Sequence, residues 1–405
     1  MDTAASVEKH AFSLLLTRWD VAGAFGDIGI LFPIAIALVS LNHMNPTAVF
    51  FTAGFAYILA GAYFKIPMAV QPFKAVAAIA LALQLPPSSI ATAGLLMGVL
   101  LSLIGLTNLV TPLARLFTLP IVRGIQLGLG LILAREGIRL ALGAKSPALV
   151  LGGLALPAWE IALGGVIILL LFQRSRRYPS ALVLLAAGVL LGSLAHGRGL
   201  ASSDWGGWGP LPLDFLHPHA VEMKKVLVAL VLPQFALTFG NSIVATENTA
   251  QVLYGTQARR VTARALSLSI GVTNLVSGML TSAPTCHGSG GITAHYKFGA
   301  RTQKSSYVIG SACLFLALFG RAAVGLLNLI PTAVLGVFLV YVGIQHGALI
   351  RDIVTRKRSL LIAVCVGLVS LIRTNLTYGF AAGFLLEGLF RLWRRLAANK
   401  LQTRL

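Results

Sequence analysis

The most informative shortage in this sequence is of charge. Only 11% of its 405 residues are charged, whereas 57% are hydrophobic. A soluble domain of this size carries about 25% charged residues. A chain so poor in charge cannot cover a water-facing surface, so the composition excludes a soluble globular protein and indicates a polytopic membrane protein. At about 20 apolar residues per crossing, the chain has room for roughly 12 to 14 crossings.

Cysteine and the motifs of enzymes are also scarce. The cysteines Cys286, Cys313 and Cys365 lie far apart in apolar runs, which excludes a disulfide framework and a zinc site. We find no nucleotide-binding loop and no nucleophile elbow, so we expect no enzyme, no cofactor and no metal site. Residues 1–10 are polar and no cleavage-like site follows the first apolar run, so we expect the first span itself to direct insertion.

Acidic residues are outnumbered by basic ones, 12 against 32, which gives a net charge of +20. In a soluble protein this excess would suggest nucleic acid as a partner. Here the basic residues gather in short gaps between apolar runs, and most of these basic residues lie on the cytoplasmic side if both termini are cytoplasmic. We therefore expect a multi-pass protein of the inner (cytoplasmic) membrane, surrounded by the lipid bilayer, with both termini in the cytoplasm and no nucleic-acid partner.

The apolar segments divide the chain into two halves of similar plan, and lipid requires each segment to be helical because its backbone must form internal hydrogen bonds. The first half has expected spans at residues 20–40, 46–63, 90–107, 119–141, 158–173 and 179–195, a short broken segment at 67–84, and an amphipathic piece around Arg115. The second half has expected spans at residues 223–246, 262–280, 305–320, 322–345, 359–374 and 377–393, and a short broken segment at 282–298. The sequence thus predicts an all-α membrane protein with 14 spans.

Seven crossings per half is an odd number, so the two halves must have opposite orientations in the membrane, as in the inverted repeats of many transporters. We expect a first repeat at residues 1–200, an extracytoplasmic connecting loop at 201–221, and a second repeat at 222–405 that ends in a short basic cytoplasmic tail. The third element of each half is short and broken. Matching interruptions of this kind point to a binding site near the middle of the bilayer.

The first broken segment contains Pro67 and Pro72 and then an Ala-rich run. The prolines prevent a continuous helix, and Pro72 suits a position just before a new helical turn. We expect an extended stretch that contains Gln71, followed by a half-helix that begins near Phe73. Its free N–H groups need a partner inside the membrane, and an anion is a natural one.

The second broken segment reads Thr-Ser-Ala-Pro-Thr-Cys-His-Gly-Ser-Gly-Gly from residue 281 to residue 291. Its glycines, including Gly288, permit a close approach of the backbone to a ligand. Side-chain donors come from Thr285, Cys286, His287 and Ser289. If a second half-helix begins near Ser289, two facing helix N-termini, each with roughly half a positive charge, would hold a dianion. The alternative is that the glycines only permit close helix packing, which leaves the polar run unexplained.

Two charged residues at membrane depth allow two interpretations each. Lys74 either attracts an anion or pairs with a buried carboxylate such as Asp27 or Glu247. Asp27 either carries a coupling proton or pairs statically with Lys74 or an arginine. Because charges at membrane depth are costly, each is a functional candidate.

Polar residues of the eighth span fall near one helical face at Gln234, Thr238, Asn241 and Glu247. This stripe faces either a cavity or a neighbouring helix that it binds through hydrogen bonds. His287 has a similar ambiguity, because a histidine there either contacts substrate, relays a proton or is satisfied structurally.

At these positions the chain resembles the molybdate-transporter family of the wider sulfate-permease (SulP) superfamily. The resemblance rests on residues 26–29, 67–74, 284–291 and 295–301, and it covers nearly the whole chain. It implies 7+7 inverted repeats, as in uracil symporters. It also implies a core domain of elements 1–4 and 8–11, a gate domain of elements 5–7 and 12–14, and an elevator-like movement of the core. Many SulP proteins have a regulatory domain after the last span and a carboxylate near Asn241. We expect neither here, so attention moves to Asp27 and Glu247 as coupling residues.

We therefore predict a secondary active transporter for a tetrahedral oxyanion, with molybdate preferred and a sulfate permease as the alternative. The predicted substrate ligands are Gln71, Phe73, Lys74, Asn241, Thr285, Cys286, His287, Gly288 and Ser289. A nucleobase symporter would need carboxylates on the eighth and tenth elements, and the second broken segment has none; a passive anion channel is a further alternative. Proton coupling and a homodimer are left open.

Overall fold

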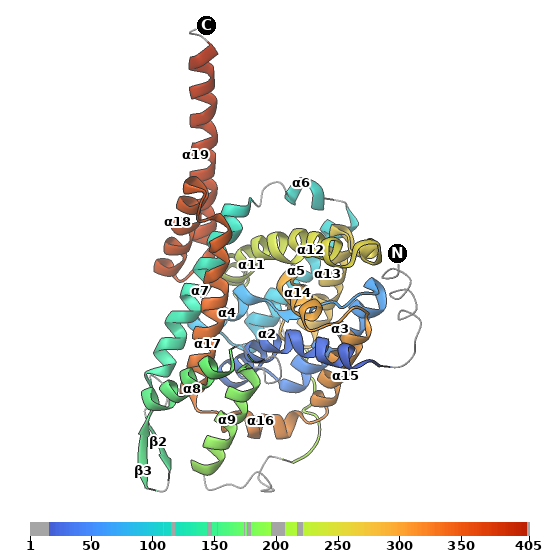
Figure 1. Cartoon of the computed structure of the whole chain (residues 1–405), viewed down its shortest axis with the longest axis vertical. Coiled ribbons are helices and arrows are strands. Elements are labelled where there is room, and N and C mark those ends of the chain that lie inside the picture. Colours follow the sequence, from blue (N-terminus) through green and yellow to red (C-terminus); the bar gives the residue numbers. More distant parts are fainter. Residues whose placement is uncertain are drawn as a thin grey trace.

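The computed structural model describes residues 16–107, 109–114, 118–143, 148–151, 153–173, 175, 180–195, 207–216 and 222–402. Almost all of them are helical, as the apolar composition requires in lipid. Figure 1 shows a body of helices from which the C-terminal part of α19 projects.

The first half runs through helices that match the expected spans closely. These are α2 (Arg18–Asn42), α3 (Pro46–Phe64), the short strand β1 (Gln71–Pro72), α4 (Lys74–Leu83), α5 (Pro87–Leu106), α6 (Val110–Ala114), α7 (Leu119–Ala141), α8 (Ala158–Phe172) and α9 (Ser180–Ala195). Between α7 and α8 lies a hairpin that the sequence analysis did not anticipate, β2 (Ala148–Leu151) paired with β3 (Leu154–Pro157). The predicted amphipathic piece corresponds to α6, and Arg115 itself lies outside the described residues.

The second half begins with a long, locally irregular helix. Its parts are α10 (Met223–Val226), the π-helical turn η2 (Leu227–Val231), α11 (Leu232–Leu237), the π-helical turn η3 (Thr238–Val244) and α12 (Ala245–Tyr254), followed by the 3-10 helix η4 (Gly255–Arg260). Then come α13 (Ala263–Met279), β4 (Thr285–Cys286), α14 (Ser289–Lys297), α15 (Lys304–Ala317), α16 (Gly320–Asn328), α17 (Thr332–Gly347), η5 (Ala348–Ile353), α18 (Lys357–Arg373) and α19 (Leu376–Gln402). π-Helical turns are rare and are frequent at functional sites.

Two breaks in the helices have identifiable causes. α2 bends by 45° between Ile28 and Ile30; Pro33 lacks the N–H that would bond to the carbonyl of Gly29, four residues before it. α16 turns by 85° from α15, and Pro331 then caps the start of α17. The expected single span at 322–345 is therefore wrong, because the proline divides it into α16 and α17.

Among the described residues, four helices are long and apolar enough to cross a membrane, and six are if each bent pair counts as one span. α4, α8 and residues 183–195 of α9 are shorter apolar helices. Large apolar side chains such as Leu171, Ile372 and Leu385 are exposed on the outside, as expected for a multi-pass membrane protein that faces lipid.

The helices form two groups, which lie on the right and on the left of Figure 1. The compact bundle consists of α2–α5 and α11–α15, in which α5 packs on α13 and α3 on α15. The lateral bundle consists of α7–α9 and α17–α19, in which α17 and α18 both pack on α7. Glycines allow the closest approach between helices: a Cβ at Gly130 of α7 would lie 2.5 Å from the carbonyl oxygen of Gly343 on α17.

Candidate functional site

The two broken segments meet at the centre of the compact bundle. β1 pairs antiparallel with β4, with Gln71 opposite Cys286 and Pro72 opposite Thr285. The N–H of Phe73 donates to the carbonyl oxygen of Pro284 over 2.8 Å. α4 begins two residues after the end of β1, and α14 begins three residues after the end of β4. The pairing therefore fixes the N-termini of both half-helices close to each other inside the protein.

The N-terminus of α4 is capped by a side chain from another helix. The Oε1 atom of Gln234 on α11 accepts hydrogen bonds from the N–H groups of Ala75 (2.9 Å) and Val76 (3.4 Å). The amide nitrogen of Gln234 donates to the Thr238 hydroxyl, which holds the cap in place. The expectation that the free N–H groups of this half-helix await an anion is thus wrong for these two amides.

The N-terminus of α14 is open. Its N-cap residue Gly288 provides no side-chain hydrogen bond, and the N–H groups of Ser289 and Gly290 have no hydrogen-bond partner among the described residues. A Cβ at Gly290 would meet nothing within 4 Å. The Ser289 hydroxyl donates to Oδ1 of Asn241 on η3 over 3.1 Å. Free N–H groups at a helix N-terminus favour an anion.

This open end faces a cavity of about 820 Å³ between the two bundles. The compact bundle contributes residues of α2, α4, η3, α12 and α14, and the lateral bundle contributes residues of α7, α17 and η5. Three predicted ligands line it: Lys74, Asn241 and Ser289. Because a water molecule occupies about 30 Å³ of liquid, the cavity has room for a small anion with many waters.

The charged side chains that line the cavity are all basic. Lys74 is only 6% exposed and makes no ion pair with any described carboxylate. Arg123 of α7 pairs with Asp352 of η5 and donates to Gln126 over 2.8 Å. No aspartate or glutamate is among the lining residues that the structure describes. A nearly buried ammonium without a partner is costly, so the cavity favours an anionic ligand.

Asp27 lies behind the cavity and holds several elements together. Its carboxylate is fully buried and accepts hydrogen bonds from the Tyr57 hydroxyl of α3 and from the side-chain amide of Gln71 on β1. A Cβ at Gly291 would lie 2.6 Å from Asp27 Oδ1 and 2.4 Å from the Cβ of Ala69. Only glycine at 291 therefore lets α14 approach this carboxylate. The Oε1 atom of Gln71 is buried and has no partner among the described residues.

The other predicted ligands lie near this centre without lining the cavity. They are Gln71, Phe73, Thr285, Cys286, His287 and Gly288, all of them buried. The side chain of Asn274 donates a hydrogen bond to the carbonyl oxygen of Thr285 and accepts one from its N–H group. The two ring nitrogens of His287 lie 2.9 Å from the Ala69 carbonyl oxygen and 2.9 Å from the Ser269 hydroxyl. These contacts are those of structural residues that fix the broken segments.

The two predicted coupling carboxylates have different surroundings. Asp27 lies among α2, α3 and β1 as described, and it makes no ion pair with Lys74. Glu247 is partly exposed on α12, makes no ion pair with any described residue, and does not line the cavity. The predicted static pair between Lys74 and either carboxylate is therefore absent within the described residues.

The sequence analysis missed the wall that the lateral bundle contributes. Arg123 and Gln126 of α7 and Gln345 and His346 of α17 all line the cavity. A polar residue inside an expected span, such as Gln126 in the span at 119–141, is the signal that would have identified this wall.

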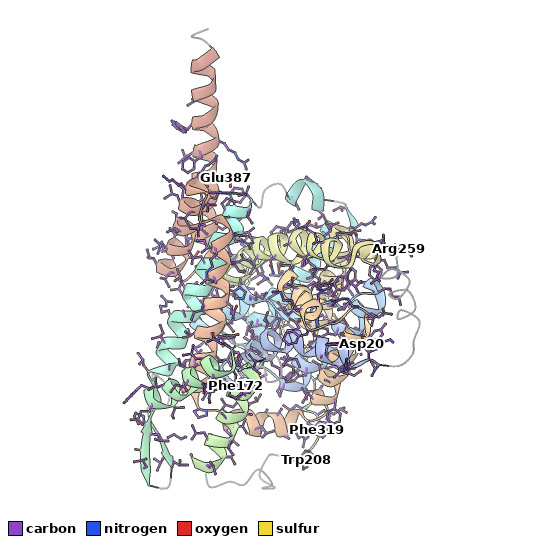
Figure 2. All side chains as sticks on the ribbon, viewed as in Figure 1. Asp20, Phe172, Trp208, Arg259, Phe319 and Glu387 are labelled. Atoms are coloured by element: carbon purple, nitrogen blue, oxygen red, sulfur yellow. The ribbon has the colours of Figure 1, made fainter. Side chains whose placement is uncertain are left out.

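The opposite end of the compact bundle is covered by residues 207–216. The N–H of Leu211 donates to the Thr47 hydroxyl over 2.9 Å, and the Asn45 amide donates to the Pro212 carbonyl oxygen over 2.7 Å. Trp208 packs edge-on against Phe319 with ring centroids 5.8 Å apart, at the lower edge of the molecule in Figure 2. Glu387 and Arg259 lie towards the other end in the same view. This segment is part of the predicted extracytoplasmic loop.

Comparison with known proteins gives a consistent result. The sequence model of a family described as "Molybdate transporter of MFS superfamily" matches residues 20–133 and 226–345. The chain is 29% identical to "Molybdate transporter 2" of Arabidopsis thaliana, over 92% of this chain and 87% of that protein. The matched segments contain both broken segments and all the lining residues of the cavity except His346 and Leu349.

Solved structures with the same fold are anion transporters. The transmembrane domain of the cyanobacterial bicarbonate transporter BicA matches with a TM-score of 0.67 at 20% identity, over 91% of this chain and 98% of that one. Murine Slc26a9, described as an anion transporter in the inward-facing state, matches with a TM-score of 0.67 at 18% identity, over 96% of this chain and 70% of that one. The fold is thus that of the SLC26 and SulP transporters.

Proposed function

Because the chain belongs to the family of molybdate transporters, we propose that it is a secondary active transporter that takes up a tetrahedral oxyanion, molybdate first and sulfate second. The observation that carries this proposal is the cavity itself. An uncapped helix N-terminus and an unpaired lysine face the same space, and no described carboxylate lines it. The lack of lining carboxylates also favours an oxyanion over a nucleobase, whose ring N–H groups need acceptors.

The anion would bind between Lys74 and the N-terminus of α14. The N–H groups of Ser289 and Gly290 and the Ser289 hydroxyl would replace part of its hydration shell, and Lys74 would offset its charge. Asn241 orients the Ser289 hydroxyl. Gln71, Phe73, Thr285, Cys286, His287 and Gly288 would act behind these groups by fixing the two broken segments.

We further propose 14 elements in two inverted repeats. The pattern of packed pairs supports it, because a two-fold relation exchanges the pairs α3–α15 and α13–α5, and likewise α14–α2 and α4–α11. The pairs β1–β4 and α7–α17 map onto themselves under the same relation. Each repeat thus contributes one half-helix to the centre.

The compact bundle would act as the core and the lateral bundle as the gate of an elevator. All the proposed anion ligands lie on the compact bundle, and only the opposite wall belongs to the lateral bundle. A rigid movement of one bundle past the other would therefore carry the intact site across the membrane. The cavity extends to Leu119 and Leu349, next to gaps that the charge pattern assigns to the cytoplasm, so this state would be inward-open.

Uptake of a dianion needs a driving ion, because entry against a negative-inside potential costs about 2.3 kcal/mol per charge for each 100 mV. We propose protons as that ion, with Asp27 and Glu247 as the carboxylate candidates. Asp27 accepts hydrogen bonds from Tyr57 and Gln71 between the elements of the compact bundle. Replacing Asp27 by Asn and measuring uptake into proteoliposomes with and without a pH gradient tests its role.

The function is tested by titrating the purified full-length protein with molybdate, sulfate, phosphate and uracil in a calorimeter. We expect molybdate to bind most tightly, with sulfate as a competitor of labelled molybdate in uptake assays. Binding of uracil alone, or of none of the four ligands, would remove the proposal. Tighter binding of sulfate than of molybdate would assign the same site to sulfate. Single-channel currents in planar bilayers would instead indicate a passive channel.

A further inference from the structure

His346 stands out among the buried titratable groups that the proposed mechanism does not use. It lies in the last turn of α17, on the lateral-bundle wall of the cavity. The residue is 8% exposed, and its Nδ1 atom is buried without a hydrogen-bond partner among the described residues. Nearly every buried polar atom in a protein has a partner, so an orphaned one needs an explanation.

The nearly buried ammonium of Lys74 on α4 of the compact bundle lines the same cavity as His346. Two cations at this position would repel each other in a space that lipid and protein shield from bulk water. An oxyanion bound beside Lys74 would reverse the balance, because its negative charge would attract a proton to the imidazole. The two binding events would therefore favour each other.

The other charged and titratable groups around His346 leave this relation intact. On α7, Arg123 lines the same cavity but is paired with Asp352 of η5. On α17 itself, Tyr341 lines the cavity one turn earlier. Neither α2 nor α14 presents a described charged side chain to the cavity, since Asp27 lies behind it, bound to Tyr57 and Gln71.

We propose that His346 binds a proton when the oxyanion binds, so that the affinity for the anion in this state depends on pH. This inference rests on the proposed function and names the proton site for it. The proton adds to the free ring nitrogen of the neutral imidazole from water in the cavity, and it leaves when the anion leaves. Linkage makes the effect reciprocal: the anion raises proton affinity by the same factor by which the proton raises anion affinity.

The position of His346 suits an elevator. The anion ligands are on the compact bundle and His346 is on the lateral bundle, so sliding one bundle past the other would separate the imidazole from the anion. The proton would then leave His346 as the anion moves away from it.

The test is calorimetric titration of the full-length protein with molybdate in two non-phosphate buffers that differ in ionisation enthalpy. The difference in observed heat gives the number of protons bound per anion. We expect the wild type to take up close to one proton per anion near pH 7.5 and its affinity to fall about tenfold per pH unit wherever one proton is taken up. His346→Gln should bind molybdate with no proton uptake, and its affinity should not change between about pH 6.5 and pH 8.5.

The matched control is His43→Asn, which also removes one imidazole. His43 is exposed at the other end of the molecule and has a left-handed backbone (φ 57°) that asparagine tolerates. It should keep the wild-type proton count. If His346→Gln fails to fold, His346→Asn takes its place. Proton uptake that persists in the His346 variant overturns the inference, and its loss in Asp27→Asn alone would assign the proton to Asp27. A wild type that binds no oxyanion would defeat the proposed function itself.

Discussion

α4 and α14 are each the short helix after the broken segment of their half, yet the N–H groups at their N-termini have different partners. At α4 the side chain of Gln234 binds two backbone N–H groups, and the charge at this end comes from the Lys74 ammonium. At α14 the N–H groups of Ser289 and Gly290 are uncapped within the described residues and face the cavity.

At the proposed site, the two half-helices would therefore serve one anion in two ways. One half would supply a full charge on a flexible side chain, and the other would supply fixed backbone dipoles. Backbone donors cost no reorganisation when the anion binds, whereas the lysine provides a longer-range attraction. Four predictions test the asymmetry, and they run from the largest expected effect to the smallest.

Lys74→Gln should have the largest effect. Two unit charges about 4 Å apart at an effective dielectric constant of 20 interact by about 4 kcal/mol, and water in the cavity reduces this. We expect the Kd for molybdate to rise on the order of 100-fold in calorimetric titrations. Lys225→Gln, which removes an exposed lysine paired with Glu222, should leave the Kd unchanged. An equal loss in both variants would mean that only the overall charge matters.

The adjacent glycines of α14 should respond differently to the same change. A Cβ at Gly291 would collide with Ala69 and Asp27, and overpacking of this kind costs about 1–3 kcal/mol. Gly291→Ala should therefore lower the melting temperature by several degrees. Gly290→Ala should leave the melting temperature intact but weaken molybdate binding roughly tenfold, because its methyl group enters the cavity. Identical behaviour of the two variants would contradict an open α14 end.

Gln234→Ala should affect stability more than affinity. It leaves the N–H groups of Ala75 and Val76 unpaired in a buried place, which costs about 1–3 kcal/mol. We expect a lower melting temperature and a molybdate Kd within about twofold of the wild type. A marked gain in affinity would mean that the anion reaches the uncapped α4 end and that the two half-helices are equivalent after all.

Ser289→Ala should have the smallest effect. It removes one hydroxyl and its hydrogen bond to Asn241 while keeping the backbone donors. A hydrogen bond contributes about 0.5–1.5 kcal/mol, so the Kd should rise by roughly 2- to 12-fold. Gln71→Ala serves as the comparison, because Gln71 does not line the cavity. This variant should lower the melting temperature, because it removes the hydrogen bond from Gln71 to Asp27. A loss of all binding in Ser289→Ala would mean that the hydroxyl, and not the backbone N–H groups, is the main anion ligand.

Much of the fold was predictable because its signals are local. The expected span at 119–141 coincides with α7, and the broken segments lie where Pro67, Pro72 and Pro284 interrupt the helices. Of the predicted ligands, Lys74, Asn241 and Ser289 line the cavity. The rest are buried behind it, since sequence shows that a segment is polar and broken but not which of its side chains face the ligand.

The amino-acid sequence by itself determined that this is a membrane protein and where its two half-helices begin, because low charge, apolar length and proline act within a few residues. Only the tertiary structure decided which half-helix end is open and which residues form the opposite wall. The cap of α4 comes from Gln234, 159 residues along the chain from Ala75, and Arg123 and His346 reach the cavity from another bundle. Contacts between residues so far apart in the sequence depend on how the helices pack, and no local sequence pattern encodes them.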